Sequence, residues 1–290
     1  MTSQALIIGL VTGASYGFVA LGLVLVYKSS GVLNFAQGEF GTVGVWALWL
    51  ATSNGVPYVP AIFLGLAAAG LFGFVTERAV VRPLADAPRV TVLVATAGVA
   101  LLAIGIQLWI GQAQIRPVAP ALGRQDRIQV FGVYVSDQRL LIIASVIGVA
   151  LALRWLFTRT SLGLAVLAAS EEPVGTRLVG VRVERLSSLV WTMAAVLGGL
   201  AGVLTAPLSG FGPGFLTTGA LVAGFTAAVI GGFTSLPGAF VGGVVVGVTQ
   251  SLATSADWLR DVPGPQTAAL FVLLVVILLA RPQGLLGRPA

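Results

Sequence analysis

The segment Gly31–Gly41, GVLNFAQGEFG, stands between two long apolar parts of the chain. It follows an apolar run that ends near residue 27 and leads directly into another that ends near residue 51. Apolar runs of about twenty residues are typical of membrane-spanning helices. Because Asn34, Gln37 and Glu39 lie within this segment, polar groups occur where the surrounding sequence predicts lipid.

The composition excludes an ordinary soluble domain. Of the 290 residues, 57% are hydrophobic and 9% are charged, and the mean hydropathy is +1.00. Soluble domains carry about 25% charged residues, so this chain could not cover a water-facing surface. The 38 glycines suit helices that pack closely in lipid. The sequence therefore predicts an all-α, polytopic integral membrane protein embedded in the lipid bilayer.

Nine apolar segments follow one another along the chain. The seventh and eighth are short and interrupted by glycine, which indicates a hairpin that does not fully cross the membrane. We therefore expect about eight to ten transmembrane helices, some broken or short, within a single transmembrane domain covering residues 1–290. The segments cover residues 5–27, 32–51, 58–76, 90–111, 139–157, 188–207, 218–233, 236–254 and 266–280.

The basic residues indicate an orientation. With the start of the chain placed outside, eleven of the 16 Lys and Arg residues lie on the inner side and five on the outer side. Cytoplasmic loops carry an excess of Lys and Arg, so we expect a cytoplasmic C-terminus. Orientation also explains the net charge of +6 without nucleic acid as a partner. The inner set is Lys28, Arg78, Arg82, Arg89, Arg154, Arg159, Arg177, Arg182, Arg185, Arg281 and Arg288, and the outer set is Arg116, Arg124, Arg127, Arg139 and Arg260.

Two linkers are long. In the extracytoplasmic linker, residues 111–138, the alternation of Ile128, Val130, Gly132 and Val133 indicates a short β-ribbon or an amphipathic flap. The cytoplasmic linker, residues 158–187, is the most polar part of the chain. Neither linker resembles a separate soluble domain, so energy for transport would have to come from other chains.

Glu39 has two interpretations. An acid within lipid is costly and often marks a substrate or ion path. Alternatively, Asn34 caps a helix, Gln37 completes a capping-box-like pair, and Glu39 lies in the second turn near the positive end of the helix. The two roles are compatible, and the residues alone leave both open.

The cytoplasmic linker is predicted to form two short helices. Residues 162–169 suit one helix, and residues 173–179 suit a second that begins with proline and stops at Gly180. The acids before the second helix and Arg177 near its end complement the helix dipole. This pattern fits either a solvated loop or a docking surface for a cytoplasmic partner.

Nothing in the sequence supports catalysis. The chain has no Cys and no His, which removes the usual ligands of zinc and haem sites and the usual partners of a nucleophile. It has no GxxxxGK[ST] phosphate loop and no carboxylate pair in an apolar setting. We therefore predict no catalytic residues, no metal site and no cofactor.

Four stretches resemble one family, the branched-chain amino acid ABC-transporter permeases, specifically the H-type subunit. The resemblance runs in order from about Tyr16 to Pro289. The matching stretches are GVLNFAQGEF at 31–40, GLAVLAASEEPVGTRLVGV at 163–181, FTAAVIGGFTSLPGAFVGGVVVGV at 225–248 and RPQGLLGRP at 281–289.

The resemblance implies partners and site residues. Such a permease pairs with a second, related permease subunit, two cytoplasmic ATPase subunits and an extracytoplasmic substrate-binding protein. The signature residues, near the translocation path, would be Asn34, Phe35, Gln37, Gly38 and Glu39. The ATPase-coupling residues would be Glu171, Glu172, Thr176, Arg177, Gly180 and Arg182.

The sequence thus predicts the permease subunit of an ABC importer in the inner (plasma) membrane. It would move branched-chain or other small neutral amino acids by alternating access driven by the partner ATPases, with the linker 158–187 as the coupling loop. A permease for urea, short amides or related small solutes fits the same residues. A stand-alone secondary carrier or channel that uses Glu39 is the rival from another class.

Overall fold

A computed structural model of the chain describes residues 2–121, 127–130, 133–259 and 262–287. Five residues named above, Arg124, Gly132, Arg260, Arg288 and Pro289, lie outside this part of the chain. The described helices are α1 (Thr2–Ser30), α2 (Gln37–Ser53), α3 (Tyr58–Thr76), α4 (Arg89–Gly111), α5 (Asp137–Arg159), α6 (Ser161–Glu171), α7 (Pro173–Leu178), α8 (Val183–Ser209), α9 (Phe215–Gly219), α10 (Leu221–Gly231), α11 (Leu236–Ser255) and α12 (Pro265–Ala280).

Within the described residues, six helical segments are long and apolar enough to cross a membrane, and α6, α10 and α12 are shorter apolar helices. This agrees with the predicted all-α, polytopic membrane protein. The third segment is longer than expected, because α3 continues through a π-helical turn, Glu77–Val81, and a 3-10 turn, Arg82–Leu84. The six long segments are Gln4–Ser30, Tyr58–Leu84, Arg89–Gly111, Asp137–Arg159, Val183–Ser209 and Leu236–Ser255.

The structure corrects one expectation about the seventh and eighth apolar segments. Residues 218–233 are short and broken as predicted, since they divide between α9 and the 11-residue helix α10. Eleven residues rise only about 16 Å, well below the ~30 Å hydrocarbon core. The eighth segment, however, is the continuous 20-residue helix α11. Its glycines do not break it, because they lie in its contact with α1 and α10.

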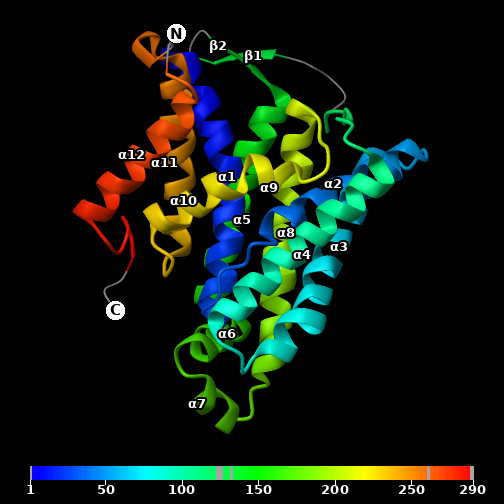
Figure 1. Ribbon diagram of the computed structural model, residues 1–290, viewed down its shortest axis with the longest axis vertical. Helices are drawn as coiled ribbons and strands as arrows, with labels where there is room; N and C mark the ends of the chain where they lie inside the picture. Colours follow the sequence, from blue (N-terminus) through cyan, green and yellow to red (C-terminus); the bar gives the residue numbers. More distant parts are fainter. Residues whose placement is uncertain (1, 122–126, 131–132, 260–261, 288–290) are drawn as a thin grey trace.

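Helix α1 runs through the centre of the molecule, with α10, α11 and α12 on one side and α2, α3, α4 and α8 on the other (Figure 1). Its contact with α11 depends on small residues. A Cβ on Gly13 would lie 2.7 Å from the carbonyl oxygen of Gly243, and one on Gly243 would lie 2.5 Å from the amide nitrogen of Gly17. Glycines four residues apart therefore let the two backbones touch, as in other tightly packed membrane helices.

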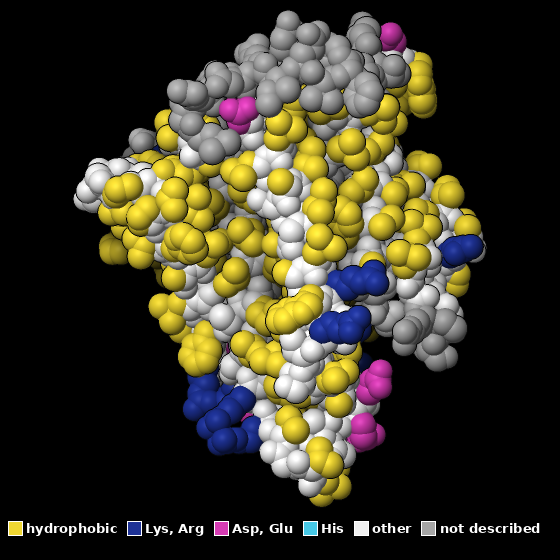
Figure 2. Space-filling model, turned by 180° about the vertical axis from the view of Figure 1, so that it is seen from behind, with side chains coloured by type: hydrophobic (Ala, Val, Ile, Leu, Met, Phe, Trp, Pro, Cys, Tyr) yellow, Lys and Arg dark blue, Asp and Glu magenta, His cyan; other side chains and the backbone are white. Residues whose placement is uncertain are grey.

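The two ends of the molecule differ. At one end strands β1 (Arg127–Val130) and β2 (Val133–Ser136) pair antiparallel, with Ile128 opposite Val135, which confirms the predicted β-ribbon. At the opposite end lie α6 and α7 (Figure 1). Figure 2 shows hydrophobic side chains spread over the middle of the molecule and most of the visible Lys and Arg in its lower half, toward the α6–α7 end.

Candidate functional site

The signature segment, residues 31–41, contains the non-helical connection between α1 and α2 and the first residues of α2, which are buried in the protein interior. The predicted capping box is wrong: α2 begins at Gln37, its N-cap residue is Ala36, and no side chain caps it. Asn34 instead turns the preceding chain, because its Oδ1 accepts a hydrogen bond from the amide of Ala36 at 3.0 Å. Glu39 consequently lies in the first turn of α2 and not in the second.

Gln37 and Gly38 join the start of α2 to three other helices. The Gln37 side chain donates a hydrogen bond to the carbonyl oxygen of Ala194 on α8 at 2.8 Å, and it packs against Gly22 on α1. A Cβ on Gly38 would lie 2.7 Å from the backbone nitrogen of Thr217 on α9. No side chain fits there, so the glycine is required for α9 to lie against α2.

Glu39 belongs to a buried polar cluster between α2, α4 and α9. Its Oε2 accepts a hydrogen bond from Gln107 Nε2 on α4 at 2.6 Å, and Gln107 Oε1 accepts one from the amide of Gly214 at 3.0 Å. Thr42 Oγ1, one turn further along α2, accepts a hydrogen bond from the amide of Leu216 at 3.2 Å. These bonds attach the backbone at the start of α9 to α2 and α4. We call Glu39, Thr42 and Gln107 the α9 lock.

Burial raises the free-energy cost of the Glu39 carboxylate in this cluster. Glu39 is fully buried, and its second oxygen, Oε1, has no hydrogen-bond partner of normal geometry among the described residues. A buried carboxylate with unused acceptor capacity is costly, so its presence indicates a role beyond packing. Gln107 was missed by the sequence analysis. A single amide within the apolar segment 90–111 was the available signal.

Phe35 faces a different neighbour. Its amide donates a hydrogen bond to Thr96 Oγ1 on α4 at 3.1 Å, and its ring stacks on Phe225 of α10 with centroids 6.2 Å apart. The residues of the signature segment therefore contact α1, α4, α8, α9 and α10. It is the packing centre where the break before α2 meets the break around α9.

Two cavities lie beside this centre. One, of about 560 Å³, is open on one side and lined by α1, α9, α10, α11 and α12, and the other, of about 340 Å³, lies between the end of α4 and residues 209–218. Thr218 on α9 lines both. None of the signature residues lines either one in this conformation. The signature thus positions α9, and α9 borders the cavities.

The linker 158–187 folds as the sequence predicts, into α6 and α7. Proline begins α7, and Gly180 follows it with φ +86°. The amide of Val181 donates to the carbonyl oxygen of Thr176 at 3.2 Å and that of Gly180 to Arg177 at 3.0 Å, which is the hydrogen-bond pattern of a Schellman C-cap. Glu172 is the N-cap residue of α7, but its side chain makes no capping hydrogen bond.

The predicted coupling residues lie on α7 or in the short segments on either side of it. Thr176 is buried and donates from Oγ1 to the carbonyl oxygen of Glu172 at 2.8 Å. Arg177 pairs with Glu184 on α8 at 3.0 Å, and both side chains are at least half exposed. Glu171 ends α6 and Arg182 precedes α8, and both are exposed.

Helix α7 also presents apolar side chains outward. Val174, Leu178 and Val179 are 63%, 84% and 78% exposed. They lie among charged residues at the polar end of the molecule. An exposed apolar patch with a charged rim is typical of a protein–protein contact.

The fold and these sites define a class: a polytopic helical membrane protein whose broken helices meet in its interior, a layout typical of transporters. Residues 5–280 match the family model described as branched-chain amino acid transport system / permease component. The chain therefore belongs to the branched-chain amino acid ABC-transporter permease family, as the sequence resemblance indicated. It is a transport permease and not an enzyme.

Curated relatives agree over the full length. The high-affinity branched-chain amino acid transport system permease protein BraD of Pseudomonas aeruginosa is 32% identical, covering 99% of this chain and 96% of that protein. The corresponding protein LivH of Escherichia coli is 28% identical over the same shares. The solved structure of PsaBC from Streptococcus pneumoniae in complex with Fab matches with a TM-score of 0.52 at 15% identity, covering 97% of this chain and 92% of that one, which supports the fold.

Proposed function

We propose that this permease imports branched-chain or other small neutral amino acids by alternating access, as one subunit of an ABC importer in the inner (plasma) membrane. Full-length similarity to BraD and LivH supports this cargo. ATP binding and hydrolysis occur on partner chains, because this sequence has no phosphate loop of its own. The permease contributes two conformational states, which the partners populate differently.

The α6–α7 end faces the cytoplasm in this proposal. The basic-residue rule assigns Arg82, Arg177 and Arg182 to the inner side. Arg177 lies on α7, Arg182 directly precedes α8, and Arg82 donates to the carbonyl oxygen of Glu184 at the start of α8. The β1–β2 end then faces the extracytoplasmic substrate-binding protein. The C-terminus, after α12, is cytoplasmic.

Linker 158–187 is the coupling loop, and α7 is the part that enters the ATPase. Helix α7 ends in a Schellman C-cap, and with Val179 just after it presents three exposed apolar side chains, which give an ATPase a surface to bind. Two ATPase subunits require two such loops, so a second, related permease completes the membrane part. The coupling residues are Glu171, Glu172, Thr176, Arg177, Gly180 and Arg182.

The signature residues Asn34, Phe35, Gln37, Gly38 and Glu39 shape the translocation path by positioning α9. Burial of Glu39 away from both cavities favours this role over direct contact with cargo in the present conformation. The rival in which Glu39 carries an ion predicts gradient-driven transport by the purified chain alone. A permease for urea or short amides differs only in cargo, which the substrate-binding protein would reveal.

The test is uptake of radiolabelled leucine by the complete importer in proteoliposomes, measured together with ATP hydrolysis. Arg177→Glu and Glu171→Lys reverse charges at the coupling surface and are expected to reduce uptake at least tenfold per ATP hydrolysed. Arg154→Glu is the matched control, because Arg154 is exposed on α5 but lies outside the linker 158–187. Normal uptake by the two α7-region variants would show that α7 is not the coupling element.

A further inference from the structure

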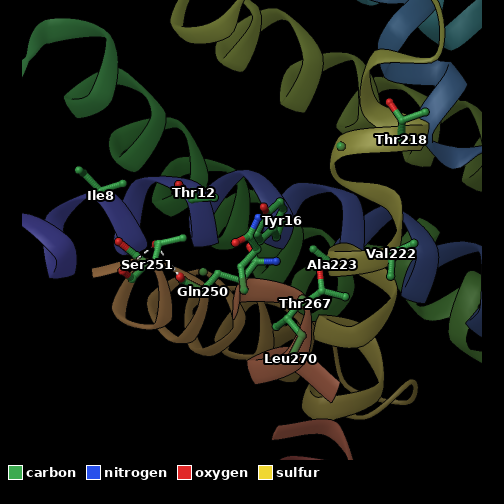
Figure 3. Close-up of a pocket in the computed structure, with 14 residues that line it drawn as sticks. Ile8, Thr12, Tyr16, Thr218, Val222, Ala223, Gln250, Ser251, Thr267 and Leu270 are labelled. Atoms are coloured by element: carbon green, nitrogen blue, oxygen red, sulfur yellow. Dashed lines mark hydrogen bonds between the residues drawn. The ribbon is translucent and has the colours of Figure 1, made fainter. Parts of the chain in front are cut away.

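The larger cavity combines a polar and an aliphatic wall. Thr12 and Tyr16 on α1, Gln250 on α11, and Gln266 and Thr267 on α12 supply hydroxyl and amide groups. Ile8, Val222 and Leu270 supply aliphatic surface. Figure 3 shows side chains from all these helices around one space. Its volume of about 560 Å³ lies within the range of small-molecule sites, ~300–1,000 Å³.

Three hydroxyls that line this cavity bond to backbone carbonyl oxygens, Thr218 to Gly214, Ser251 to Ala5 and Thr254 to Gln250. The other polar side chains of the wall differ from these. Elsewhere a hydroxyl bonds back to its own helix, as Ser15 does to the carbonyl oxygen of Val11 at 3.2 Å and Thr226 to that of Val222 at 2.9 Å. That bond removes the cost of a polar group in lipid.

The side chains of Thr12, Tyr16, Gln250, Gln266 and Thr267 make no hydrogen bond within the part of the chain that the structure describes. Two amides and three hydroxyls with unused capacity would be unfavourable against lipid tails. Their position along one cavity therefore indicates that this space holds water or a hydrogen-bonding solute.

The lining of the cavity indicates the net charge of the solute that it could bind. Among the described residues, no Asp, Glu, Lys or Arg lines the cavity. An ion with a net charge would lose its hydration there without gaining a counter-charge. A small solute without net charge that carries a polar head and an aliphatic tail satisfies both walls.

The cavity also adjoins α9, the helix that we expect to move when the translocation path opens. Thr218 lines it on α9, the short helix whose start is held by the α9 lock. Gly214 and Gly210, with φ +68° and +72°, precede α9 and allow its backbone to turn. A shift of α9 would change the inner wall of this cavity directly.

We infer that the cavity between α1, α9–α10, α11 and α12 is a solute-binding vestibule for a neutral amphiphilic solute such as a zwitterionic aliphatic amino acid. Gln250, Tyr16 and Thr12 bind its polar head, and Val222 and Leu270 contact its aliphatic part. The inference rests on the proposed function, because it assigns a binding site to the same transport route.

The chain contains no cysteine, so single cysteines can report on the cavity without background. Thr12→Cys and Gln250→Cys are introduced into the complete importer, and labelling by a membrane-impermeant maleimide is measured. Leu102→Cys on α4 is the control, because Leu102 is 65% exposed on an apolar helix outside the cavity. We expect labelling at the two cavity positions and none at the control. Leucine-loaded binding protein should slow cavity labelling at least fivefold relative to unloaded binding protein.

The outcomes separate the vestibule from the cargo. If the parent importer takes up leucine but leucine gives no protection, the vestibule is wrong and the proposed function stands. If leucine is not imported but another neutral solute is imported and protects, the cargo is wrong and the vestibule stands. Absence of labelling at both cavity positions would show that lipid or the second permease fills this space, which overturns the inference.

A substitution gives a second readout. Gln250→Leu keeps a similar volume but removes the amide, and it should lower uptake at least tenfold with a normal yield of assembled importer. Thr249→Val, on the same helix but outside the cavity lining, should change uptake less than twofold. Equal effects of the two variants would assign Gln250 to helix packing only.

Discussion

Removing Arg82 should destabilise the protein more than removing any exposed charge, because Arg82 neutralises a buried acid. Glu77 Oε2 lies 3.0 Å from Arg82 Nη2, and Ser188 Oγ on α8 donates to the same oxygen at 2.6 Å. Arg82 Nη2 also donates to the carbonyl oxygen of Glu184 at 2.7 Å. The cluster thus ties the end of the third span to the start of α8.

The expected loss in the free energy of unfolding follows from how far the Glu77 and Arg82 side chains are exposed. The Glu77 side chain is 2% exposed and the Arg82 side chain 24%. Breaking a fully buried ion pair by removing one partner costs about 3–5 kcal/mol, because an uncompensated charge remains. Since Arg82 reaches solvent in part, we expect about 2–4 kcal/mol for Arg82→Ala. Replacing both charges by apolar residues, in Glu77→Leu/Arg82→Met, removes that charge and should restore at least half of the loss.

The free energy of unfolding is measured by SDS titration in mixed micelles, with the fluorescence of the six tryptophans as the signal. Glu184→Ala is the control, because its ion pair with Arg177 is exposed and such pairs contribute about 0–1 kcal/mol. The reasoning fails if Arg82→Ala lies within about 0.5 kcal/mol of the parent protein, the range of neutral surface changes. It also fails if the double variant is no more stable than Arg82→Ala.

Three further outcomes are expected. Gln107→Leu should cost about 1–3 kcal/mol or more in the same SDS titration, because Glu39 loses its hydrogen bond while remaining buried; Glu39→Gln, which keeps an acceptor, should cost less. Gly247→Val should cost at least about 1–3 kcal/mol, because its side chain would collide with the backbone of α1, whereas Gly98→Ala, with open space around its Cβ, should stabilise α4 slightly. Arg177→Ala should change unfolding by under about 1 kcal/mol but reduce leucine uptake per ATP hydrolysed in proteoliposomes, which separates coupling from stability.

The membrane class and the two loop structures could be predicted because each depends on a local pattern. Apolar runs of sufficient length predict helices, and alternation around Ile128 predicted the β-ribbon. Proline and Gly180 marked both ends of α7. The boundary of α2 could not be predicted, because the Asn34 side chain bonds to the amide of Ala36, two residues ahead, and the helix starts only at Gln37.

Side-chain contacts that depend on an irregular helical turn or on distant segments could not be predicted from local sequence patterns. In an α-helix, residues five apart lie about 140° from each other, so Glu77 and Arg82 would not be paired by inspection. The π-helical turn between them places residues five apart one above the other, and the ion pair forms. Likewise, nothing local links Glu39 to Gln107, which is 68 residues away. Only the meeting of two broken segments creates that contact.

Helix α8 connects these features. Its first two turns carry Glu184, which pairs with Arg177 on α7, and Ser188, which joins the Glu77 cluster. Further along, its Ala194 carbonyl binds Gln37 at the start of α2. A 27-residue helix is about 40 Å long, so α8 reaches from α7 to the start of α2.

If α7 receives the ATPase stroke, as proposed, the displacement reaches α2 through contacts on α8 and not through a flexible loop. The start of α2 holds α9 through Thr42, and Glu39 holds it through Gln107 and Gly214. A displacement of α8 against α2 would therefore load the α9 lock, next to the cavity that Thr218 lines. Breaking these bonds would leave Glu39 buried without its partner at a cost in free energy, so we expect the α9 lock to resist small displacements of α8 and to yield only to a second packed arrangement.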